Sequence, residues 1–434
     1  MRSIVSYPGN MQHAQQIARA LHENGWLAAY VTSFCYRSGG AADNIIARLP
    51  WGLARKVRTQ LQRRCIEEVP SDLVHSYPFW EVLRSGALKG RAGPVIVDRL
   101  WDRMSQRFDD LVARRYVRGS QAIHAFEYTA LATFQRAGTE HVARILHLAS
   151  LSSRSFEEIR KRESAGLKEC EDPNAAYFAG KFPQRQARRD AEIALADLII
   201  ANSTLTAQSH IAQGADPAKV VVVPLGAPPV LAQARPARGG VRSSLNVVYA
   251  GHFTLGKGAL YLLDAWRRLG AKGMARLDVY GQVHIPQRLL AQADDSVVFH
   301  GVVSRSELFG AYDHADVLVF PSLSDGFGMV VAEAMANGLP VITTNMVGAA
   351  ADLVTPKNGL IIPAADANAL TQALLWCLDN RQVLEEMRVE ALASARQHQW
   401  PNYRLTLIER LGLGLAGDGA SYLRQHLAAY KVAK

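Results

Sequence analysis

The sequence predicts an α/β protein with two doubly wound, mostly parallel sheets. Residues 3–32 contain a short apolar run, a helical pattern and a second apolar run, which is the opening of a doubly wound sheet. Residues 315–344 show the same strand–helix–strand order in the second half. Residues 227–244 lie between these halves and contain three prolines and two glycines with little periodicity, so a domain boundary is expected there. A chain of 434 residues also suggests two or three domains.

Composition narrows the class of protein. Apolar residues make up 49% and charged residues 20% of the chain, as in ordinary globular proteins, and no apolar run is long enough to span a membrane. The apolar stretch at the N-terminus is too short for a signal peptide. Four scattered cysteines without a C-x-x-C motif indicate neither a disulfide scaffold nor a zinc site, so a reducing cytoplasm is expected.

The positive charge is concentrated in the first half. Residues 1–228 contain 30 Lys and Arg against 22 Asp and Glu, whereas the remainder contains 19 against 17. Such a surface suits anionic lipid, nucleic acid or a phosphorylated substrate. No aromatic-interleaved RNA-binding motif or zinc finger accompanies it, which argues against nucleic acid.

The first half begins with a strand at residues 3–6, a turn that contains Gly9 and Asn10, a helix that ends near Asn24 and a strand at residues 26–32. Residues 51–65 form a basic amphipathic helix. It could lie on an anionic membrane, or pack on the sheet with a solvated charged face. Residues 98–118 are also Arg-rich and helical, with solvated ion pairs or a phosphate-bearing acceptor as alternative interpretations.

Further along, residues 124–138 are predicted to be helical and residues 143–148 to form a strand. His147 lies near the end of that strand. A histidine at a strand end is usually structural, and His124 competes with it as a functional candidate. Residues 190–203 read as a helix followed by a strand, and residues 220–223 form the last strand of this half.

The second half restarts with a strand at residues 245–249 and the sequence G-H-F-T-L-G-K-G from Gly251 to Gly258. This nearly matches the phosphate-binding G-x(4)-G-K-[ST] loop, and a helix follows it at residues 259–269. Position 258 is Gly rather than Ser or Thr, so the hydroxyl that usually binds Mg²⁺ is missing. A phosphate site without a metal is the better interpretation.

Residues 315–344 carry the strongest motif. A buried strand at residues 317–320 leads into the turn Asp325-Gly326-Phe327-Gly328 and a helix at residues 329–336 that contains Glu333. Glycines let the backbone approach a ligand closely, and a helix N-terminus offers free N–H groups. The two carboxylates therefore mark a candidate ligand-binding loop.

The pattern P-S-x-x-D-G-F-G-x(4)-E-A-x-A-x-G-x-P-V-I, from Pro321 to Ile342, closely resembles the nucleotide-binding signature of retaining glycosyltransferases of family 4, which have the GT-B fold. That signature normally reads E-x(7)-E, and here Asp325 replaces the first Glu. Residues 190–203 resemble the family segment E-x(3)-A-D-x-I-I-x-x-S. Gly251 to Gly258 resemble G-R-L-x(3)-K-G, with His252 in place of Arg.

The resemblance implies a division of the chain. Residues 1–228 would be a Rossmann-like acceptor-binding domain, 229–244 a linker, and 245–395 a Rossmann-like nucleotide-sugar-binding domain. Residues 396–434 would be helices that pack back on the first domain.

The resemblance also assigns roles. Glu333 would hold the nucleotide ribose, Asp325 the donor sugar, and Lys257, helped by His252, the diphosphate. Backbone groups of the donor site would complete the binding, and the acceptor side would include Gly9 and Asn10. His147 would face the donor sugar. The backbone candidates are Gly251, Val302, Val303, Gly326, Phe327 and Gly328.

The implied activity is transfer of a sugar from a nucleotide-diphosphate donor to an acceptor, with retention at the anomeric carbon. The nucleotide sugar is a substrate, and neither a cofactor nor a metal is expected. A polysaccharide precursor, a lipid-linked sugar and a small metabolite are all open as acceptors, and the protein could contact the cytoplasmic membrane face peripherally. Two alternatives stay open: a non-catalytic nucleotide-sugar-binding subunit, and a GT-B phosphorylase or epimerase.

Overall fold

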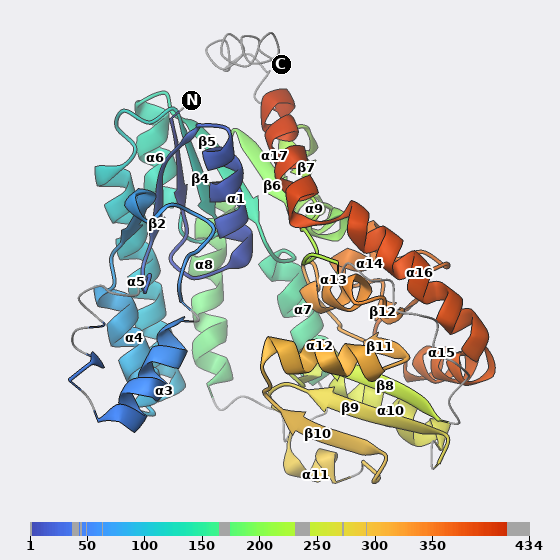
Figure 1. The fold of residues 1–434 in the computed structure, drawn as a ribbon. Helices are drawn as coiled ribbons and strands as arrows, with labels where there is room; N and C mark the ends of the chain where they lie inside the picture. The colour runs from blue at the N-terminus through green and yellow to red at the C-terminus, as the bar shows by residue number, and fades with distance from the viewer. Residues whose placement is uncertain are drawn as a thin grey trace.

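The protein is represented by a computed structural model. It describes residues 2–36, 43, 46–48, 50–62, 64–164, 174–230, 244–270, 273–291 and 293–414. Two lobes, each built on a parallel sheet with helices on both faces, are visible in Figure 1. The predicted pair of doubly wound sheets is therefore confirmed. Most of the predicted linker lies outside the described residues, so its boundaries stay a prediction.

The first sheet has seven strands in the order β3-β2-β1-β4-β5-β6-β7. Each neighbouring pair is parallel, and β1 lies between β2 and β4. Strand order therefore reverses between β1 and β4, which is where ligands bind in such sheets. The strands are β1 (Ser3–Ser6), β2 (Leu27–Thr32), β3 (Val74–Ser76), β4 (Ala122–Phe126), β5 (Ala143–Leu148), β6 (Leu198–Ala201) and β7 (Val220–Val222).

The helices of the first lobe differ in how they contact the sheet. Helix α1 follows β1 and buries a continuous face that includes Ile17 and Leu21. Helices α5 and α8 are long and bring their charged side chains together, as described below. The helices are α1 (Gln12–Glu23), α3 (Trp51–Gln62), α4 (Phe79–Lys89), α5 (Pro94–Arg115), α6 (Leu131–Thr139), α7 (Ser153–Ser164), α8 (Ala175–Leu195) and α9 (Thr204–Ile211).

The second sheet has six strands in the order β10-β9-β8-β11-β12-β13 and reverses between β8 and β11. All four residues of β11 are buried, as expected for a strand with helices on both faces. The strands are β8 (Leu245–Ala250), β9 (Ala275–Tyr280), β10 (Val297–Gly301), β11 (Val317–Phe320), β12 (Val341–Thr344) and β13 (Gly359–Ile362). The helices are α10 (Ala259–Leu269), α11 (Gln287–Leu290), α12 (Arg305–His314), α13 (Met329–Ala336), α14 (Gly348–Leu353), α15 (Ala367–Asp379), α16 (Arg381–Gln397) and α17 (Trp400–Gly414).

The last described helices return to the first lobe, as predicted. Helix α16 lies along the second lobe and α17 reaches α1, which Figure 1 shows in red beside blue. Arg404 on α17 donates to Glu23 (2.8 Å) and to Gln16 (2.7 Å) on α1. This contact ties the C-terminal part of the described chain to its N-terminal part.

One secondary-structure prediction is wrong. Residues 124–138 are not one helix, because His124 lies in β4 and the helix α6 starts only at Leu131. The five residues of β4 are all buried. A short apolar run buried on both faces has no period-two alternation, so the sequence alone did not separate it from the helix that follows.

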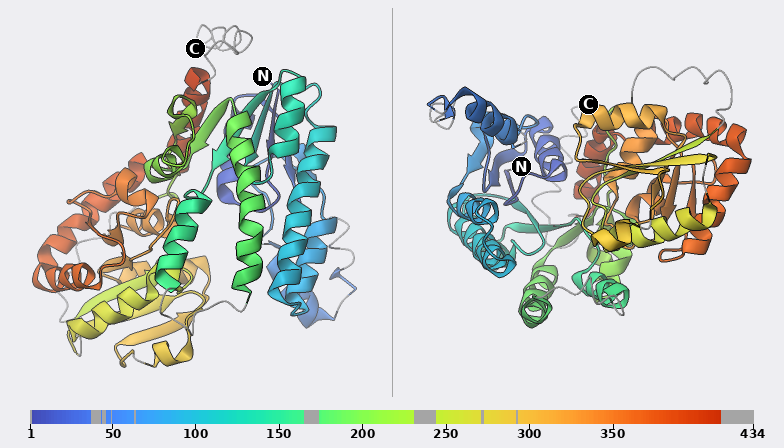
Figure 2. Two further views of the ribbon diagram at one scale, coloured as in Figure 1. Left: turned by 180° about the vertical axis from the view of Figure 1, so that it is seen from behind. Right: turned by 90° about the horizontal axis from the view of Figure 1, so that it is seen from below.

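The two lobes lie side by side in the view from below in Figure 2. Among the described residues, no helix combines the length and the apolar character that a membrane crossing requires.

Candidate donor site and acceptor cavity

The loop after β8 places Lys257 at the switch point of the second sheet. Gly258 has a φ of +77° and ends the short 3₁₀ turn Leu255–Lys257 directly before α10. A Cβ atom built on Gly258 would lie 1.9 Å from the carbonyl oxygen of Pro321. Only glycine therefore lets the loop after β8 lie against the loop after β11.

The two loops are joined by an ion pair. The Lys257 ammonium lies 2.7 Å from a carboxylate oxygen of Asp325 and donates to the carbonyl of Ser324 at 3.2 Å. The other Asp325 oxygen accepts from the backbone N–H of Phe327 at 3.2 Å. The structure therefore brings together the two charged residues to which the family resemblance assigns the diphosphate and the donor sugar. Both side chains are partly exposed, so an incoming anion can compete for the ammonium group.

Glu333 lies behind this loop on α13. Its side chain is 19% exposed, and the Arg305 guanidinium lies 3.5 Å from one carboxylate oxygen. Burial raises the pKa of Glu333, and the positive charge of Arg305 opposes that shift. A carboxylate that is largely desolvated gains from hydrogen-bond donors, and adjacent hydroxyl groups are suitable donors.

The remaining donor-side candidates lie at the same edge of the second sheet. His252 is exposed, and its ring packs against that of His284 with centroids 5.5 Å apart. Val302 and Val303 follow β10 and lead directly into α12, which carries Arg305. Gly251 has a φ of +126° and follows β8. The roles assigned to these residues stay predictions.

The first lobe contacts the glycine turn directly. The hydroxyls of Ser203 and Thr206 donate to the carbonyl of Gly326 at 2.5 and 3.1 Å. A Cβ on Gly326 would lie 2.5 Å from the carbonyl oxygen of Ala149, in the loop after β5. Thr204 adds two hydrogen bonds to Asp352, from its backbone N–H and its hydroxyl. The loop that carries Asp325 is therefore held from both lobes.

His147 is fully buried and lies in β5 rather than at an open strand end. Its Nε2 is 3.0 Å from Nδ1 of His124, and the two rings stack. Burial and the neighbouring imidazoles hold the pKa of His147 well below its usual value. In this conformation its side chain reaches neither Asp325 nor the loop around it by any described contact, so its catalytic role stays a prediction.

Gly9 and Asn10, the predicted acceptor-side residues, line a cavity of about 900 Å³ in the first lobe. Asn10 accepts a hydrogen bond from Gln15 at the start of α1. The cavity wall also includes Arg64, Glu81 and Trp101, which come from three separate parts of the chain. Sequence reasoning missed these residues because no motif connects them.

Glu192, Asp197 and Ser203 occupy the fixed positions of the family segment that residues 190–203 resemble. The resemblance assigned them no role. Glu192 accepts from the backbone N–H groups of Ala130 and Leu131, so it caps the start of α6. Asp197 forms an ion pair with Arg144. Ser203 makes the contact with Gly326 described above. The structure therefore gives this segment a role in positioning.

Within the described ranges, no group of three or more His, Cys, Asp or Glu side chains is placed to hold a metal ion. Lys257 and the N-termini of α10 and α13 are the positive groups beside Asp325 and the glycine turn.

Part of the chain is similar to a known protein family. Residues 244–380 match the family model of glycosyl transferases group 1. The matched part of the chain contains Lys257, Asp325 and Glu333.

Curated relatives extend the similarity beyond that part. The D-inositol 3-phosphate glycosyltransferase of Xylanimonas cellulosilytica is 29% identical over 262 residues, which cover 54% of this chain and 62% of the relative. The probable sucrose-phosphate synthase 5 of Oryza sativa subsp. japonica is 29% identical over 164 residues, or 38% of this chain and 14% of the relative. For the first three relatives, the matched part spans 59% to 65% of the relative's length.

Solved structures show the fold over nearly the whole chain. HepE of Anabaena in complex with UDP superposes with a TM-score of 0.62 at 15% identity, covering 95% of this chain and 99% of HepE. Sucrose-phosphate synthase from Thermosynechococcus elongatus gives a TM-score of 0.59 at 19% identity, covering 99% and 100%. The fold is therefore GT-B, as predicted.

Proposed function

We propose that the protein is a retaining glycosyltransferase that moves a sugar from a nucleotide-diphosphate donor to a saccharide or lipid-linked acceptor. The observation that carries the proposal is the Lys257–Asp325 ion pair, which lies at the switch point of the second sheet inside the part of the chain that matches the group 1 family model. Relatives named as glycosyltransferases support the reaction class. The UDP and UDP-glucose complexes of HepE support a nucleotide-sugar donor.

In this mechanism the chain neutralises the departing diphosphate with its own cations. Lys257 exchanges Asp325 for the diphosphate oxygens, and His252 assists. Release from Lys257 leaves Asp325 able to accept from the donor sugar, while the N–H groups of Gly326, Phe327 and Gly328 complete the contact. Asp is one methylene shorter than the Glu of the family pattern, so a water molecule can bridge it to the sugar. No metal or cofactor takes part in this scheme.

Glu333 accepts hydrogen bonds from the ribose hydroxyls. Burial raises the pKa of Glu333, and the positive charge of Arg305, 3.5 Å away, opposes that rise. Closure of the lobes around the donor excludes water and limits wasteful hydrolysis. The cytoplasmic location and the peripheral membrane contact are part of the same proposal.

A donor panel tests the proposal. Binding and slow release of nucleoside diphosphate are measured with UDP-, GDP- and ADP-sugars on wild type, Glu333→Gln and Glu390→Gln. One donor is expected to bind. Glu333→Gln is expected to lower the affinity for that donor by about 10- to 100-fold, because a neutral amide replaces the desolvated carboxylate that accepts the hydrogen bonds. Glu390 is exposed on α16 and serves as the matched control.

The outcomes separate the alternatives. Binding without release, even with acceptor mixtures, would favour the non-catalytic subunit, for which the departures at His252 and Asp325 are the motivating observation. Phosphorolysis or epimer formation without an acceptor would favour a GT-B phosphorylase or epimerase. Absence of binding to every donor would contradict the proposal.

A further inference from the structure

Helix α4 presents its apolar side chains to solvent. Phe79, Val82 and Leu83 are 65%, 54% and 42% exposed and are spaced i, i+3 and i+4, so they form one stripe. Glu81, between them in the sequence, is only 5% exposed. A surface helix of a globular protein normally buries its apolar stripe and exposes its polar face. The reversed arrangement indicates that an apolar surface covers the exposed side of α4 in the functional state of the protein.

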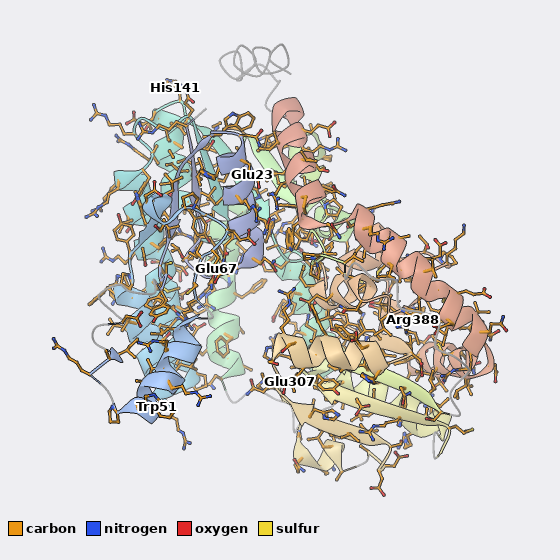
Figure 3. All side chains as sticks on the ribbon, viewed as in Figure 1. Glu23, Trp51, Glu67, His141, Glu307 and Arg388 are labelled. Carbon is orange, nitrogen blue, oxygen red and sulfur yellow. The ribbon has the colours of Figure 1, made fainter. Side chains whose placement is uncertain are left out.

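The stripe is part of a larger surface at one end of the first lobe. We call α3, α4 and the N-terminal part of α5 the tip. Trp51 on α3 is 79% exposed, and Figure 3 shows it at the lower end of this lobe. Leu88 and Ile96 are also exposed. Exposed apolar side chains that gather at one end of a domain indicate a contact site for a protein or a membrane.

The charge of the tip favours an anionic surface. Residues 48–104 contain 11 Lys and Arg against 6 Asp and Glu. Four of the six acids are neutralised in the structure: Glu68 binds Arg19, Glu81 binds Arg64 and Arg84, and Asp98 and Asp102 both bind Arg185. Basic side chains on the exposed face include Arg55, Lys89, Arg91, Arg99 and Arg103. A surface that combines apolar side chains with surplus cations fits an anionic lipid bilayer.

The cavity that contains Gly9 and Asn10 lies directly behind the stripe. Val82 both lines this cavity and belongs to the exposed stripe, so the two are contiguous. The inner face of α4 supplies Glu81 and Arg84 to the cavity wall, and Trp101 of α5 adds an aromatic ring. The cavity therefore joins a polar, charged interior to an apolar outer surface.

The interior of the cavity has surplus hydrogen-bond donors. Arg84 donates to both oxygens of Glu81, at 2.8 and 2.9 Å, and Arg64 donates to one of them at 2.8 Å. Each guanidinium carries five N–H donors, and one carboxylate has about four acceptor positions. The two guanidiniums and one carboxylate also have a net positive charge. Such a pair suits a phosphate group, which guanidinium forks bind well.

We propose that the tip rests on an anionic membrane and that the cavity behind α4 receives the phosphate-bearing head group of a lipid-linked acceptor. The inference rests on the proposed transferase function, and it selects one acceptor class among those the sequence left open. The apolar stripe of α4 enters the lipid, the cations around it contact lipid phosphates, and the acceptor's chain stays in the bilayer.

Vesicle sedimentation of the full chain tests the surface. Wild type is expected to bind phosphatidylcholine vesicles that contain phosphatidylglycerol, and to bind pure phosphatidylcholine at least tenfold more weakly. The triple variant Phe79→Ser, Val82→Ser, Leu83→Ser should lose roughly tenfold or more in affinity for the anionic vesicles, because three apolar side chains no longer enter the lipid.

The matched control is Leu375→Ser, Val389→Ser, Leu405→Ser, which changes three exposed apolar side chains of the C-terminal helices. It should bind the vesicles like wild type. Nucleotide binding, measured on both triple variants, should be unchanged, so a failure of the membrane proposal is distinguishable from a failure of the donor site. The proposal would be overturned if wild type did not bind anionic vesicles, or if the stripe variant bound them as tightly as wild type does.

A second arm tests the cavity and separates a lipid head group from a free phosphate. The probes are phosphatidic acid in phosphatidylcholine vesicles and inorganic phosphate alone. Arg84→Lys keeps a positive charge against Glu81 but loses the planar fork. It should lower affinity for the phosphatidic acid vesicles by roughly fivefold or more, with less than a twofold effect on phosphatidylglycerol vesicles. If inorganic phosphate bound wild type as tightly as the vesicles do, the proposal that the phosphate belongs to a lipid-linked acceptor would be overturned.

Discussion

The donor loops of the second lobe and the tip of the first lobe arrange charge and apolar surface in opposite ways. At the donor loops, Lys257 and Asp325 pair across two short turns that are packed backbone against backbone. At the tip, Glu81 of α4 is buried, whereas Phe79, Val82 and Leu83 of the same helix are exposed to solvent. The first arrangement has little room for substitution, whereas the second leaves an exposed apolar surface.

The comparison teaches where local sequence is informative. The donor loops depend on glycines that permit close approach, such as Gly258 against Pro321, and these positions form a recognisable pattern. The cavity of the first lobe is assembled from Gly9, Arg64, Arg84 and Trp101, which are far apart in the sequence and follow no spacing rule. A motif therefore identified the donor loops, whereas sequence reasoning named only Gly9 and Asn10 among the residues that line the cavity.

The largest effect is expected from Gly258→Ala. The new Cβ would lie 1.9 Å from the Pro321 carbonyl oxygen in a left-handed conformation. The unfavourable backbone conformation and the clash together should cost about 3–5 kcal/mol of unfolding free energy. Urea unfolding measures it, with donor binding as a second readout.

Gly256→Ala is the matched control, because a Cβ there meets no atom within 4 Å and its φ is not positive. Two variants with equal stability would contradict the idea that close backbone approach defines the donor loops.

A smaller effect is expected when the pH is lowered, and it concerns the stability of the first lobe. His13, His124 and His147 are fully buried neighbours, and burial lowers the pKa of His13 and of His124 to about 3, below the ordinary 6.5. The unfolded chain therefore takes up protons before the folded one does. The stability due to neutral histidines is complete above pH 6.5 and is lost as the pH falls toward 3. At pH 5.5 the loss is about 1.4 kcal/mol for each histidine.

Urea midpoints at pH 7.5 and pH 5.5 measure this loss. His124→Asn should reduce the pH dependence, while His22→Asn, at an exposed position on α1, should leave it as in wild type. Equal pH dependence in all three proteins would show that the histidine cluster is not responsible.

The smallest effect is expected at the contact between the first lobe and the donor loops. Ser203→Ala removes the hydroxyl that donates to Gly326 and accepts from the N–H of Thr206. It should cost about 1–2 kcal/mol of stability, because a buried carbonyl loses one donor and α9 loses its cap. Because Thr206 still contacts Gly326, donor affinity should fall only severalfold.

Calorimetry of donor binding measures the change, with Ser306→Ala on α12 as a control hydroxyl outside this contact. Unchanged donor affinity together with lowered stability would mean that the first lobe supports the fold without positioning the donor loop.

The sequence by itself determined the fold class and the donor loops. Short apolar runs alternating with helical periods predict parallel sheets, and glycines and carboxylates near Lys257 and Glu333 form a local pattern. The prediction from sequence failed at residues 124–126, because a strand buried on both faces has no alternation of apolar and polar residues that separates it from a helix. Only the tertiary structure decided that His147 is enclosed, that Ser203 holds the Gly326 turn, and that α4 faces outward. These depend on which segments meet across the sheet, and contacts between residues that are distant in sequence have no signature in local periodicity.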